Sequence, residues 1–298
     1  MRDTVITGET KVYGIIGCPV RHSLSPVFQA YFARKHGLDV VYTPYHVEEG
    51  QLKQAVRGLA SLGVLGVNVT VPYKEAMLPY VHADDDVQCI GAANTLKWDG
   101  SVWLASNTDW QGINTVFAGT GLILKGEHLL LFGAGGTARA VLHAASKHGL
   151  SRVAICNRSP ERVKLLIEHA QRYYPGMHCY ALAWQQAAVT AACHTSSMVL
   201  NTTSIGLSAA DVFPFQIYGQ GWLLDAVYKP SGETAFLHAA ALSDRSMTDG
   251  LAMLVAQGAK SFRDWHPECR PDTLDALAWM EAQLERQPIV FPGWEGGR

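Results

Sequence analysis

The stretch that most constrains the fold runs from Glu127 to Cys156. It begins with a segment over 127–132, apolar from Leu129 to Phe132, that is typical of a buried parallel strand. This run leads directly into a glycine-rich turn that fits the dinucleotide-binding fingerprint, made of Gly133, Ala134, Gly135, Gly136, Thr137 and Ala138. A helix over 139–148 and a strand over 152–156 are expected to follow. Each piece lies where a mononucleotide-binding unit needs it, so a dinucleotide site is favoured over a turn that binds nothing.

The residues after the second strand of this unit indicate which dinucleotide is bound. Proteins that bind NAD usually place an acidic residue here, to accept from the ribose 2′-hydroxyl. This chain has Asn157 and Arg158 instead, with Arg162 one helical turn later. Guanidinium groups suit a 2′-phosphate, and Ser159 can cap the helix that Pro160 opens. NADP is therefore predicted, against the alternative that both arginines are ordinary solvated charges.

The first hundred residues alternate strand and helix patterns. Strands are predicted at 12–17, 40–45 and 66–71, with helices from Pro26 and over 51–62 between them. This order predicts an α/β domain with a mostly parallel sheet, in which ligands bind beyond the carboxyl ends of the strands. Ser23, Ser25, Thr70 and Lys74 are expected at such ends. For Ser25, a helix cap before Pro26 is the simpler alternative.

Lys74 follows a strand and Pro72, so it is predicted in the first turn of a helix. The positive end of a helix dipole disfavours an ammonium group, which suits a lysine that transfers protons. Asp109 is a candidate partner for it, and the alternative is that Asp109 only caps the helix starting near Trp110. Asn94 precedes a predicted hairpin that turns at Asp99 and Gly100.

Two later segments add candidates with weaker local signals. A strand over 222–228 is predicted to present its end, with Ala226, to a cofactor and Tyr228 to a substrate. Tyr228 is equally compatible with a wall residue whose hydroxyl faces water. Gly250 opens a predicted helix over 249–258 and is a further cofactor candidate. Gln257 lies on the same helix, where a solvated amide is the default interpretation.

Composition narrows the class of protein. The 298 residues suggest two domains, and a net charge of −2 with 17% charged residues speaks against nucleic acid and anionic membranes as partners. The six cysteines are scattered without a Cys-x-x-Cys pair, so neither a metal site nor a disulfide framework is expected. The first residues carry no apolar signal core, and a cytoplasmic location is expected.

A set of motifs runs in order over nearly the whole chain: Gly17-Cys18-Pro19, His22-Ser23-Leu24-Ser25-Pro26, 68–74, 91–95, Asn107-Thr108-Asp109, 133–136, Asn157-Arg158 and 253–259. Together these motifs resemble the shikimate dehydrogenase family. It implies a substrate domain of residues 1–110, completed by 249–298, and a Rossmann-type NADP domain of residues 111–248.

The resemblance also implies an activity and its residues. The activity is NADP-dependent, reversible reduction of 3-dehydroshikimate to shikimate in aromatic amino acid biosynthesis, with Lys74 and Asp109 as the acid–base pair. Ser23 and Ser25 would hold the substrate carboxylate, whereas Thr70, Asn94, Asp109, Tyr228 and Gln257 would hold its hydroxyls. A homodimer is an open expectation. Alternatives are a quinate/shikimate dehydrogenase using NAD and a catalytically silent ligand-sensing homologue.

Overall fold

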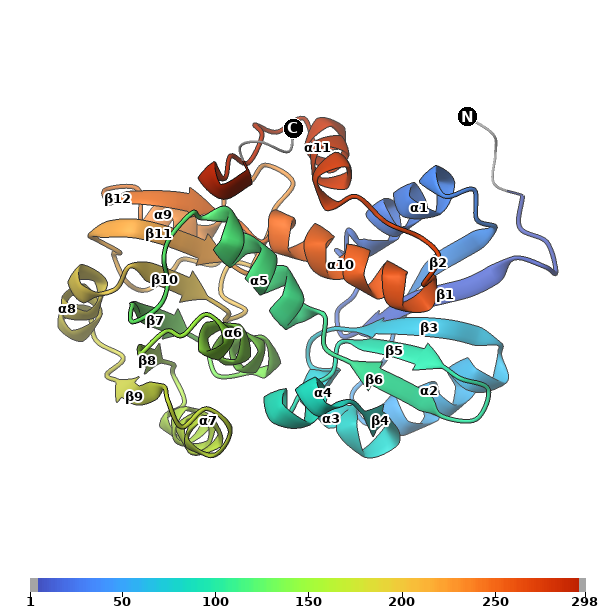
Figure 1. Cartoon of the computed structure of the whole chain (residues 1–298), viewed down its shortest axis with the longest axis horizontal. Helices are drawn as coiled ribbons and strands as arrows, with labels where there is room; N and C mark the ends of the chain where they lie inside the picture. Colours follow the sequence, from blue (N-terminus) through green and yellow to red (C-terminus); the bar gives the residue numbers. More distant parts are fainter. Residues whose placement is uncertain (1–4, 295–298) are drawn as a thin grey trace. The chain divides into compact units, whose positions relative to one another are not determined.

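The computed structural model describes residues 5–294 and divides into two compact units (Figure 1). The first unit contains residues 1–111 and 255–276, and the second contains residues 112–254 and 277–298. The chain passes between them within three helices, α5 (Asp109–Gly119), α10 (Leu251–Trp265) and α11 (Thr273–Gln283). Among the described residues, no helix has both the length and the apolar character needed to cross a membrane.

The first unit is built on one mixed sheet of six strands. Its strand order is β2-β1-β3-β5-β6-β4, and β2, β1 and β3 are mutually parallel, as the alternating strand and helix pattern predicts. The Asp99–Gly100 turn joins an antiparallel hairpin of β5 and β6 at the side of β3. The strands are β1 (Lys11–Gly17), β2 (Val40–His46), β3 (Val64–Val69), β4 (His82–Ala83), β5 (Thr95–Trp98) and β6 (Trp103–Ser106).

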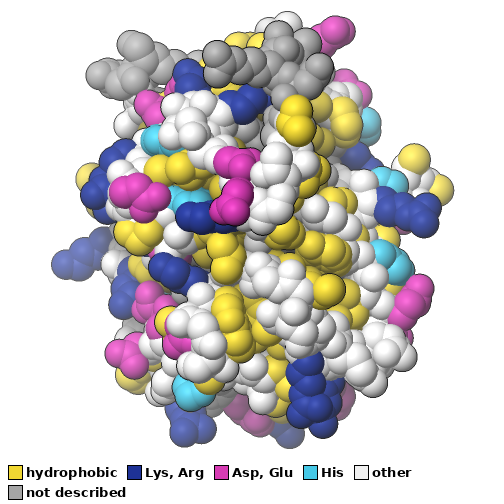
Figure 2. All heavy atoms as spheres, turned by 90° about the vertical axis from the view of Figure 1, so that its right-hand side faces the viewer, with side chains coloured by type: hydrophobic (Ala, Val, Ile, Leu, Met, Phe, Trp, Pro, Cys, Tyr) yellow, Lys and Arg dark blue, Asp and Glu magenta, His cyan; other side chains and the backbone are white. Residues whose placement is uncertain are grey.

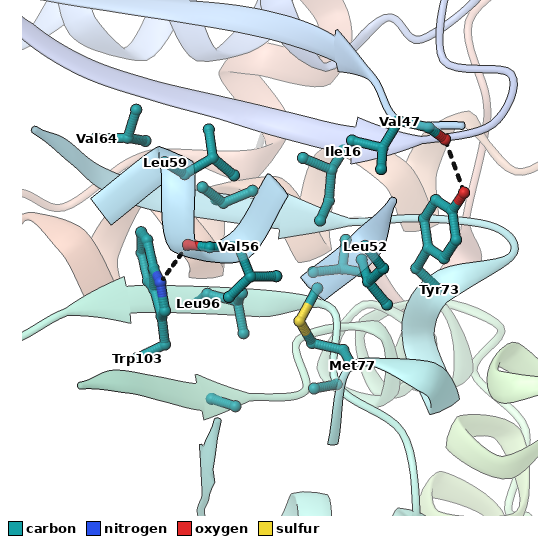
Figure 3. Close-up of a cluster of buried hydrophobic side chains, with 14 of the residues drawn as sticks. Ile16, Val47, Leu52, Val56, Leu59, Val64, Tyr73, Met77, Leu96 and Trp103 are labelled. Carbon is teal, nitrogen blue, oxygen red and sulfur yellow. Dashed lines mark hydrogen bonds between the residues drawn. The ribbon is translucent and has the colours of Figure 1, made fainter. Parts of the chain in front are cut away.

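Helix α2 (Leu52–Ser61) closes a hydrophobic core against this sheet (Figure 3). Leu52, Val56 and Leu59 recur at helical spacing and are all buried, which explains why this segment is an amphipathic helix. Two hydrogen bonds pin the ends of the core: the Tyr73 hydroxyl donates to the Val47 carbonyl at 2.7 Å, and the Trp103 indole N–H donates to the Val56 carbonyl at 3.2 Å. The unit's other helices are α1 (Ser25–Lys35), α3 (Tyr73–Ala76), α4 (Asp85–Ile90) and the 3-10 turn Leu78–Tyr80.

The second unit has a six-stranded sheet that is parallel throughout. Its order is β12-β11-β10-β7-β8-β9, which, counted from β7, is the 3-2-1-4-5-6 order of doubly wound dinucleotide-binding folds. The order reverses between β7 and β10, which is where such folds bind ligands. The strands are β7 (His128–Phe132), β8 (Arg152–Cys156), β9 (His178–Leu182), β10 (Met198–Asn201), β11 (Gln220–Asp225) and β12 (Asp244–Thr248).

The helices of the second unit follow the expected alternation with its strands. The glycine-rich turn leads into α6 (Gly136–Lys147), and Ser159 caps the next helix by accepting from the Arg162 amide. Both features are as predicted from the sequence. These helices are α6, α7 (Pro160–Tyr173), α8 (Gln186–Thr195), α9 (Ala235–Ala239) and the 3-10 turn Pro292–Trp294.

Some boundaries differ from the sequence prediction. The strand expected over 222–228 ends at Asp225, and α10 continues to Trp265 rather than ending near Gly258. Residues from 277 onward group with the second unit, because Phe291 stacks on Trp222 with ring centroids 5.4 Å apart. Residues 1–4 and 295–298, which the sequence assigns to the substrate domain, lie outside the described part of the chain.

Charged side chains of both signs mix over the face of the molecule shown in Figure 2. Lysine and arginine side chains alternate there with aspartate and glutamate side chains and with apolar ones. Such a mixed surface matches the small net charge of −2. A field of one sign, which would steer a polyanion, therefore does not dominate this face.

Candidate active site

The centre of the candidate site is an ion pair between Lys74 and Asp109. Lys74 Nζ lies 2.6 Å from Asp109 Oδ2, and the two side chains are 13% and 5% exposed. Lys74 comes from α3, just after β3, whereas Asp109 is the first residue of α5, just after β6. Because the pair is largely buried, its two charges interact strongly, and the two side chains are treated together as one ion pair.

Helix geometry supports one part of the sequence argument for Lys74 and corrects another. The lysine does lie in the first turn after Pro72, as predicted. However, α3 has only four residues, so few peptide dipoles add up along it and the expected dipole effect is small. The electrostatic environment of Lys74 is instead set by the Asp109 carboxylate.

The helix-capping roles that were the alternatives for Ser25 and Asp109 are not what the structure shows. Ser25 does not cap α1: the cap position is Leu24, and Ser25 is the first helical residue. Asn107 Oδ1 accepts from the Trp110 amide at 3.3 Å, so Asn107 bonds the first turn of α5. Asp109 is thereby left to pair with Lys74.

Asn94 holds the other oxygen of the Asp109 carboxylate. Its Nδ2 lies 2.9 Å from Asp109 Oδ1, and its Oδ1 accepts from the Thr108 amide at 2.6 Å. Asn94 is 2% exposed, and it reaches these groups from the loop between α4 and β5. Asp109 is therefore oriented on both sides, by a lysine and by an amide.

Gln257 joins the same cluster from α10. Its Oε1 lies 3.1 Å from Asn94 Nδ2, although the two residues are 163 positions apart. At 7% exposure, Gln257 is not the solvated amide that local sequence suggests. Four of the predicted site residues are thus brought together by hydrogen bonds: Lys74, Asn94, Asp109 and Gln257.

A buried polar network that the sequence analysis did not identify supports this cluster. Ser261 lies one turn after Gln257 and accepts from Asn68 Nδ2 at 2.9 Å, while its Oγ is 3.0 Å from Thr108 Oγ1. Thr95 completes the network, 2.8 Å from Ser261. The sequence does contain one sign of this network, because Asn68 is a polar residue between two valines of a predicted strand. The four residues come from β3, β5, α10 and the loop before α5, so no sequence spacing links them.

The remaining predicted residues of the first unit have local partners. The Ser25 amide donates to Ser23 Oγ at 3.2 Å, and the Thr70 amide donates to the Ile16 carbonyl at 2.9 Å. These bonds hold the three residues at the carboxyl ends of β1 and β3, where the sequence placed them. A Cβ atom at Gly17 would lie 2.4 Å from the Thr70 methyl group, so only glycine allows this approach.

The glycine-rich turn of the second unit has the geometry of a nucleotide cradle. Gly133 has a φ of +111°, and a Cβ there would lie 2.4 Å from Thr202 Oγ1, so a side chain is excluded. At Gly135, in contrast, a Cβ would have no atom within 4 Å of it, which leaves room for a ligand to approach the backbone. Gly136, Thr137 and Ala138 form the first turn of α6, whose amides suit a pyrophosphate. The turn therefore fits a dinucleotide.

Three further predicted features lie in the second unit. Asn157, Arg158 and Arg162 follow β8, and both arginines are exposed. Gly250 packs on Ala226, since a Cβ at Gly250 would lie 2.4 Å from the Ala226 carbonyl oxygen. Tyr228 is half-buried in the same unit.

Comparison with known proteins identifies the family to which this chain is similar. A family model described as the shikimate dehydrogenase substrate binding domain matches residues 15–96. A shikimate dehydrogenase (NADP(+)) from Geobacter metallireducens is 36% identical over 265 residues, covering 87% of this chain and 92% of the relative. Among solved structures, shikimate dehydrogenase from Aquifex aeolicus superposes with a TM-score of 0.79 at 34% identity, covering 91% of this chain and 98% of that one.

A second solved structure was determined with ligands bound. It is shikimate 5-dehydrogenase from Listeria monocytogenes in complex with shikimate and NAD. It superposes with a TM-score of 0.80 at 26% identity, covering 94% of this chain and 98% of that chain. The similarity in both comparisons extends over both units.

Proposed function

This chain belongs to the shikimate dehydrogenase family, and from this premise we propose that Lys74 and Asp109 are the acid–base pair of its reaction. The enzyme is an NADP-dependent oxidoreductase of the shikimate pathway, which leads to the aromatic amino acids. The reaction is the reversible reduction of 3-dehydroshikimate to shikimate. The observation that supports this assignment is the largely buried ion pair, in which Lys74 Nζ lies 2.6 Å from Asp109 Oδ2.

The cofactor and the protein divide the chemistry. The second unit would hold NADPH, which would supply a hydride to the substrate carbonyl carbon and leave as NADP⁺. Lys74 gives its proton to the carbonyl oxygen, which becomes a hydroxyl, and the neutral amine then regains a proton from water. Asp109 keeps the ammonium group in position and accepts from the same hydroxyl. General acid help of this kind contributes roughly 10²–10⁴-fold to the rate.

Substrate recognition is assigned to the polar groups around this pair. Ser23 and Ser25 present hydroxyls at the end of β1 for the substrate carboxylate. Groups that can bind ring hydroxyls are Thr70, Asn94, Asp109, Gln257 and, from the second unit, Tyr228. The buried network behind Asn94 and Gln257 supports this role, because it fixes the direction of both amides.

The second unit is proposed to bind NADP. Gly133, Ala134, Gly135, Gly136, Thr137 and Ala138 would hold the pyrophosphate, while Ala226 and Gly250 would line the nicotinamide. Asn157, Arg158 and Arg162 would hold the adenosine 2′-phosphate, since guanidinium groups bind phosphate oxygens through paired hydrogen bonds. The steric room above Gly135 and the doubly wound strand order support this assignment.

The Lys74→Ala variant tests the proton-transfer role. We expect kcat to fall by about 100-fold or more with shikimate and NADP⁺, followed by NADPH absorbance, while shikimate still binds in calorimetry. Lys53→Ala, at an exposed position on α2, is the matched control and keeps the wild-type rate. Near-normal turnover in Lys74→Ala would contradict the proposal.

The same assay separates the alternatives. A wild-type protein that binds shikimate but turns over neither shikimate nor quinate, with either nicotinamide, would be a ligand-sensing homologue. Faster turnover with NAD and quinate would indicate the NAD-dependent alternative. We propose that the protein is a homodimer and that it is located in the cytoplasm. Light scattering tests the dimer, because one chain has a mass of 32.4 kDa and a dimer twice that.

A further inference from the structure

A thiol, an imidazole and a carboxylate meet at a place that the proposed reaction does not use. Cys18, His46 and Glu48 each bring one potential ligand atom, and these three atoms all lie within 4.8 Å of one another. His46 Nε2 is 3.8 Å from Cys18 Sγ and 3.2 Å from Glu48 Oε1. None of the three belongs to the Lys74–Asp109 cluster.

Strand register explains why these residues meet. The parallel pairing of β1 with β2 places Gly17 opposite His46, so Cys18 emerges beside the residues that follow β2. Sequence spacing does not indicate a metal site here, because the ligands come from the ends of two different strands. Such a site is visible only once the sheet has formed.

The backbone that carries the three side chains is held firmly. The Val47 amide donates to the Gly17 carbonyl at 3.2 Å, and the Cys18 amide donates to the Val71 carbonyl at 3.0 Å. Val47 lies between His46 and Glu48 in the sequence and is buried. Its carbonyl accepts from the Tyr73 hydroxyl, as Figure 3 shows. A fixed backbone lowers the entropy lost when ligands gather around an ion.

The distances fit a tetrahedral zinc site. Zinc binds cysteine sulfur at about 2.3 Å and histidine nitrogen or carboxylate oxygen at about 2.0–2.2 Å. Tetrahedral angles then separate sulfur from nitrogen by about 3.6 Å and nitrogen from oxygen by about 3.3 Å. The observed separations of 3.8 Å and 3.2 Å lie close to both values. The third separation, between Cys18 Sγ and the Glu48 carboxylate oxygen, is within 4.8 Å.

Covalent catalysis by Cys18 is a poorer explanation of the same cluster. In a thiol–imidazole–carboxylate relay, the nucleophile and the orienting carboxylate contact opposite nitrogens of the ring. Here Cys18 and Glu48 both approach Nε2 of His46. One ring nitrogen holds at most one proton and cannot serve both neighbours equally. A metal ion, by contrast, bonds to all three groups at once.

We propose that Cys18, His46 and Glu48 bind one Zn²⁺ ion, with water as the fourth ligand. The donor set of thiolate, imidazole and carboxylate is one that zinc accepts, with the fourth position left open. Solvent gives a direct entry path, because the His46 and Glu48 side chains are 39% and 75% exposed. The bound ion links the ends of β1 and β2.

Cobalt substitution is the sharpest test. The full, reduced, chelator-treated chain is titrated with Co²⁺, and visible absorption is recorded. We expect one Co²⁺ per chain, intense d–d bands typical of four-coordination, and a thiolate-to-cobalt charge-transfer band that Zn²⁺ abolishes. Absence of the charge-transfer band would overturn the proposal, since no thiolate would then bind the ion.

Variants assign the signal to these residues. Cys18→Ser is expected to remove the charge-transfer band, and His46→Gln to weaken Zn²⁺ binding by more than about tenfold. Cys89→Ser, at the other half-buried cysteine, is the matched control and keeps both. Wild-type binding in Cys18→Ser or His46→Gln would overturn the proposal. If Cys18→Ser fails to fold, His46→Gln and Glu48→Gln decide, because both replace exposed side chains.

Thermal unfolding gives an independent readout. An ion that binds only the folded chain raises the unfolding temperature with increasing concentration. We therefore expect Zn²⁺ to raise the Tm of the wild type and of Cys89→Ser, and to leave the Tm of His46→Gln unchanged. An equal rise in all three would place the zinc elsewhere and contradict the site.

Discussion

Asn94 Nδ2 lies 2.9 Å from Asp109 Oδ1, on the same carboxylate whose other oxygen accepts from Lys74 at 2.6 Å. The two oxygens of Asp109 are thus held by groups from different elements. A carboxylate held on both sides has little freedom to rotate, so the direction of the lysine is fixed as well. Asn94 is in this way a positioning residue for the proposed acid–base pair.

Replacing Asn94 by alanine tests this positioning role. We expect kcat/KM for shikimate to fall by about 10- to 100-fold, because Asp109 loses one of its two partners. The Thr108 amide also loses its acceptor, at a cost of about 1–3 kcal/mol in the free energy of unfolding. Initial rates and urea unfolding measure the two effects.

Asn114→Ala is a suitable control for Asn94→Ala. Asn114 is a half-buried asparagine of the second unit, and its Oδ1 lies 2.8 Å from His148 Nε2. Its replacement should leave kcat/KM near the wild-type value. Equal losses of activity in the two variants would show that Asn94 has no special relation to Asp109.

The candidate site was predictable from sequence only where local rules act. The strand, proline and helix around Lys74 place it at the carboxyl end of β3, and Asp109 similarly follows β6. The burial of Gln257 depends on α10 packing beside residues some 160 positions earlier, a relation that no local pattern encodes. The same holds for Ser261, whose partners Asn68, Thr95 and Thr108 lie on other elements.

Arg158→Ala tests cofactor choice. A charge-assisted hydrogen bond to the 2′-phosphate is worth about 1.5–3 kcal/mol, so KM for NADPH should rise by roughly 10- to 100-fold. KM for NADH should change little, because NADH has no 2′-phosphate. Arg152→Ala, at the opposite end of β8, is the control and should alter neither constant. An unchanged NADPH preference in Arg158→Ala would contradict the assignment.

The fold was more predictable than the site, and its gaps have a physical reason. The apolar residues before Gly133 and the alternating strand and helix patterns after them predict the strands β7, β8 and β11, and short right-handed connections make such strands parallel. Strand β12 was not predicted, because Asp244–Thr248 is an edge strand in which two polar residues, Arg245 and Thr248, are buried while its one apolar residue, Met247, is exposed. The grouping of the C-terminal residues with the second unit rests on the Phe291–Trp222 stack, which sequence does not reveal.

A buried ion pair gives a stability prediction for the second unit. Arg286 Nη1 and Nη2 contact the two oxygens of Asp249 at 2.8 Å and 3.0 Å, and the side chains are 7% and 0% exposed. Arg286→Met leaves the carboxylate buried without its partner, so we expect a loss of about 3–5 kcal/mol in urea unfolding. Adding Asp249→Asn to Arg286→Met should recover part of this loss.

A surface pair provides the comparison for Arg286. Lys35 and Asp275 lie 3.1 Å apart but are 54% and 46% exposed. Lys35→Met should therefore cost at most about 1 kcal/mol. If Arg286→Met costs no more than Lys35→Met, the buried pair does not stabilise the unit.

Asp225 predicts a pH dependence of stability in the second unit. Burial raises the pKa of this carboxyl from 3.8 to about 7, although Asn201 and the Val227 amide both donate to its Oδ1. The nearby Asp249 carboxylate acts in the same direction as burial. The folded chain therefore keeps a proton on Asp225 at pH values where the unfolded chain has lost it. Stability from this group is fully present below about pH 4 and is lost as the pH rises to about 7.

Asp225→Asn is expected to remove this dependence. The amide keeps an oxygen to accept from Asn201 and Val227 but carries no charge at any pH. Unfolding free energies measured in urea from pH 4 to pH 8 should fall by up to about 4 kcal/mol more in the wild type than in Asp225→Asn. Asp244→Asn, at an exposed position of β12, is the control and should follow the wild-type curve. Parallel curves for wild type and Asp225→Asn would show that Asp225 is already ionised in the folded protein, and that its burial is compensated by its hydrogen bonds.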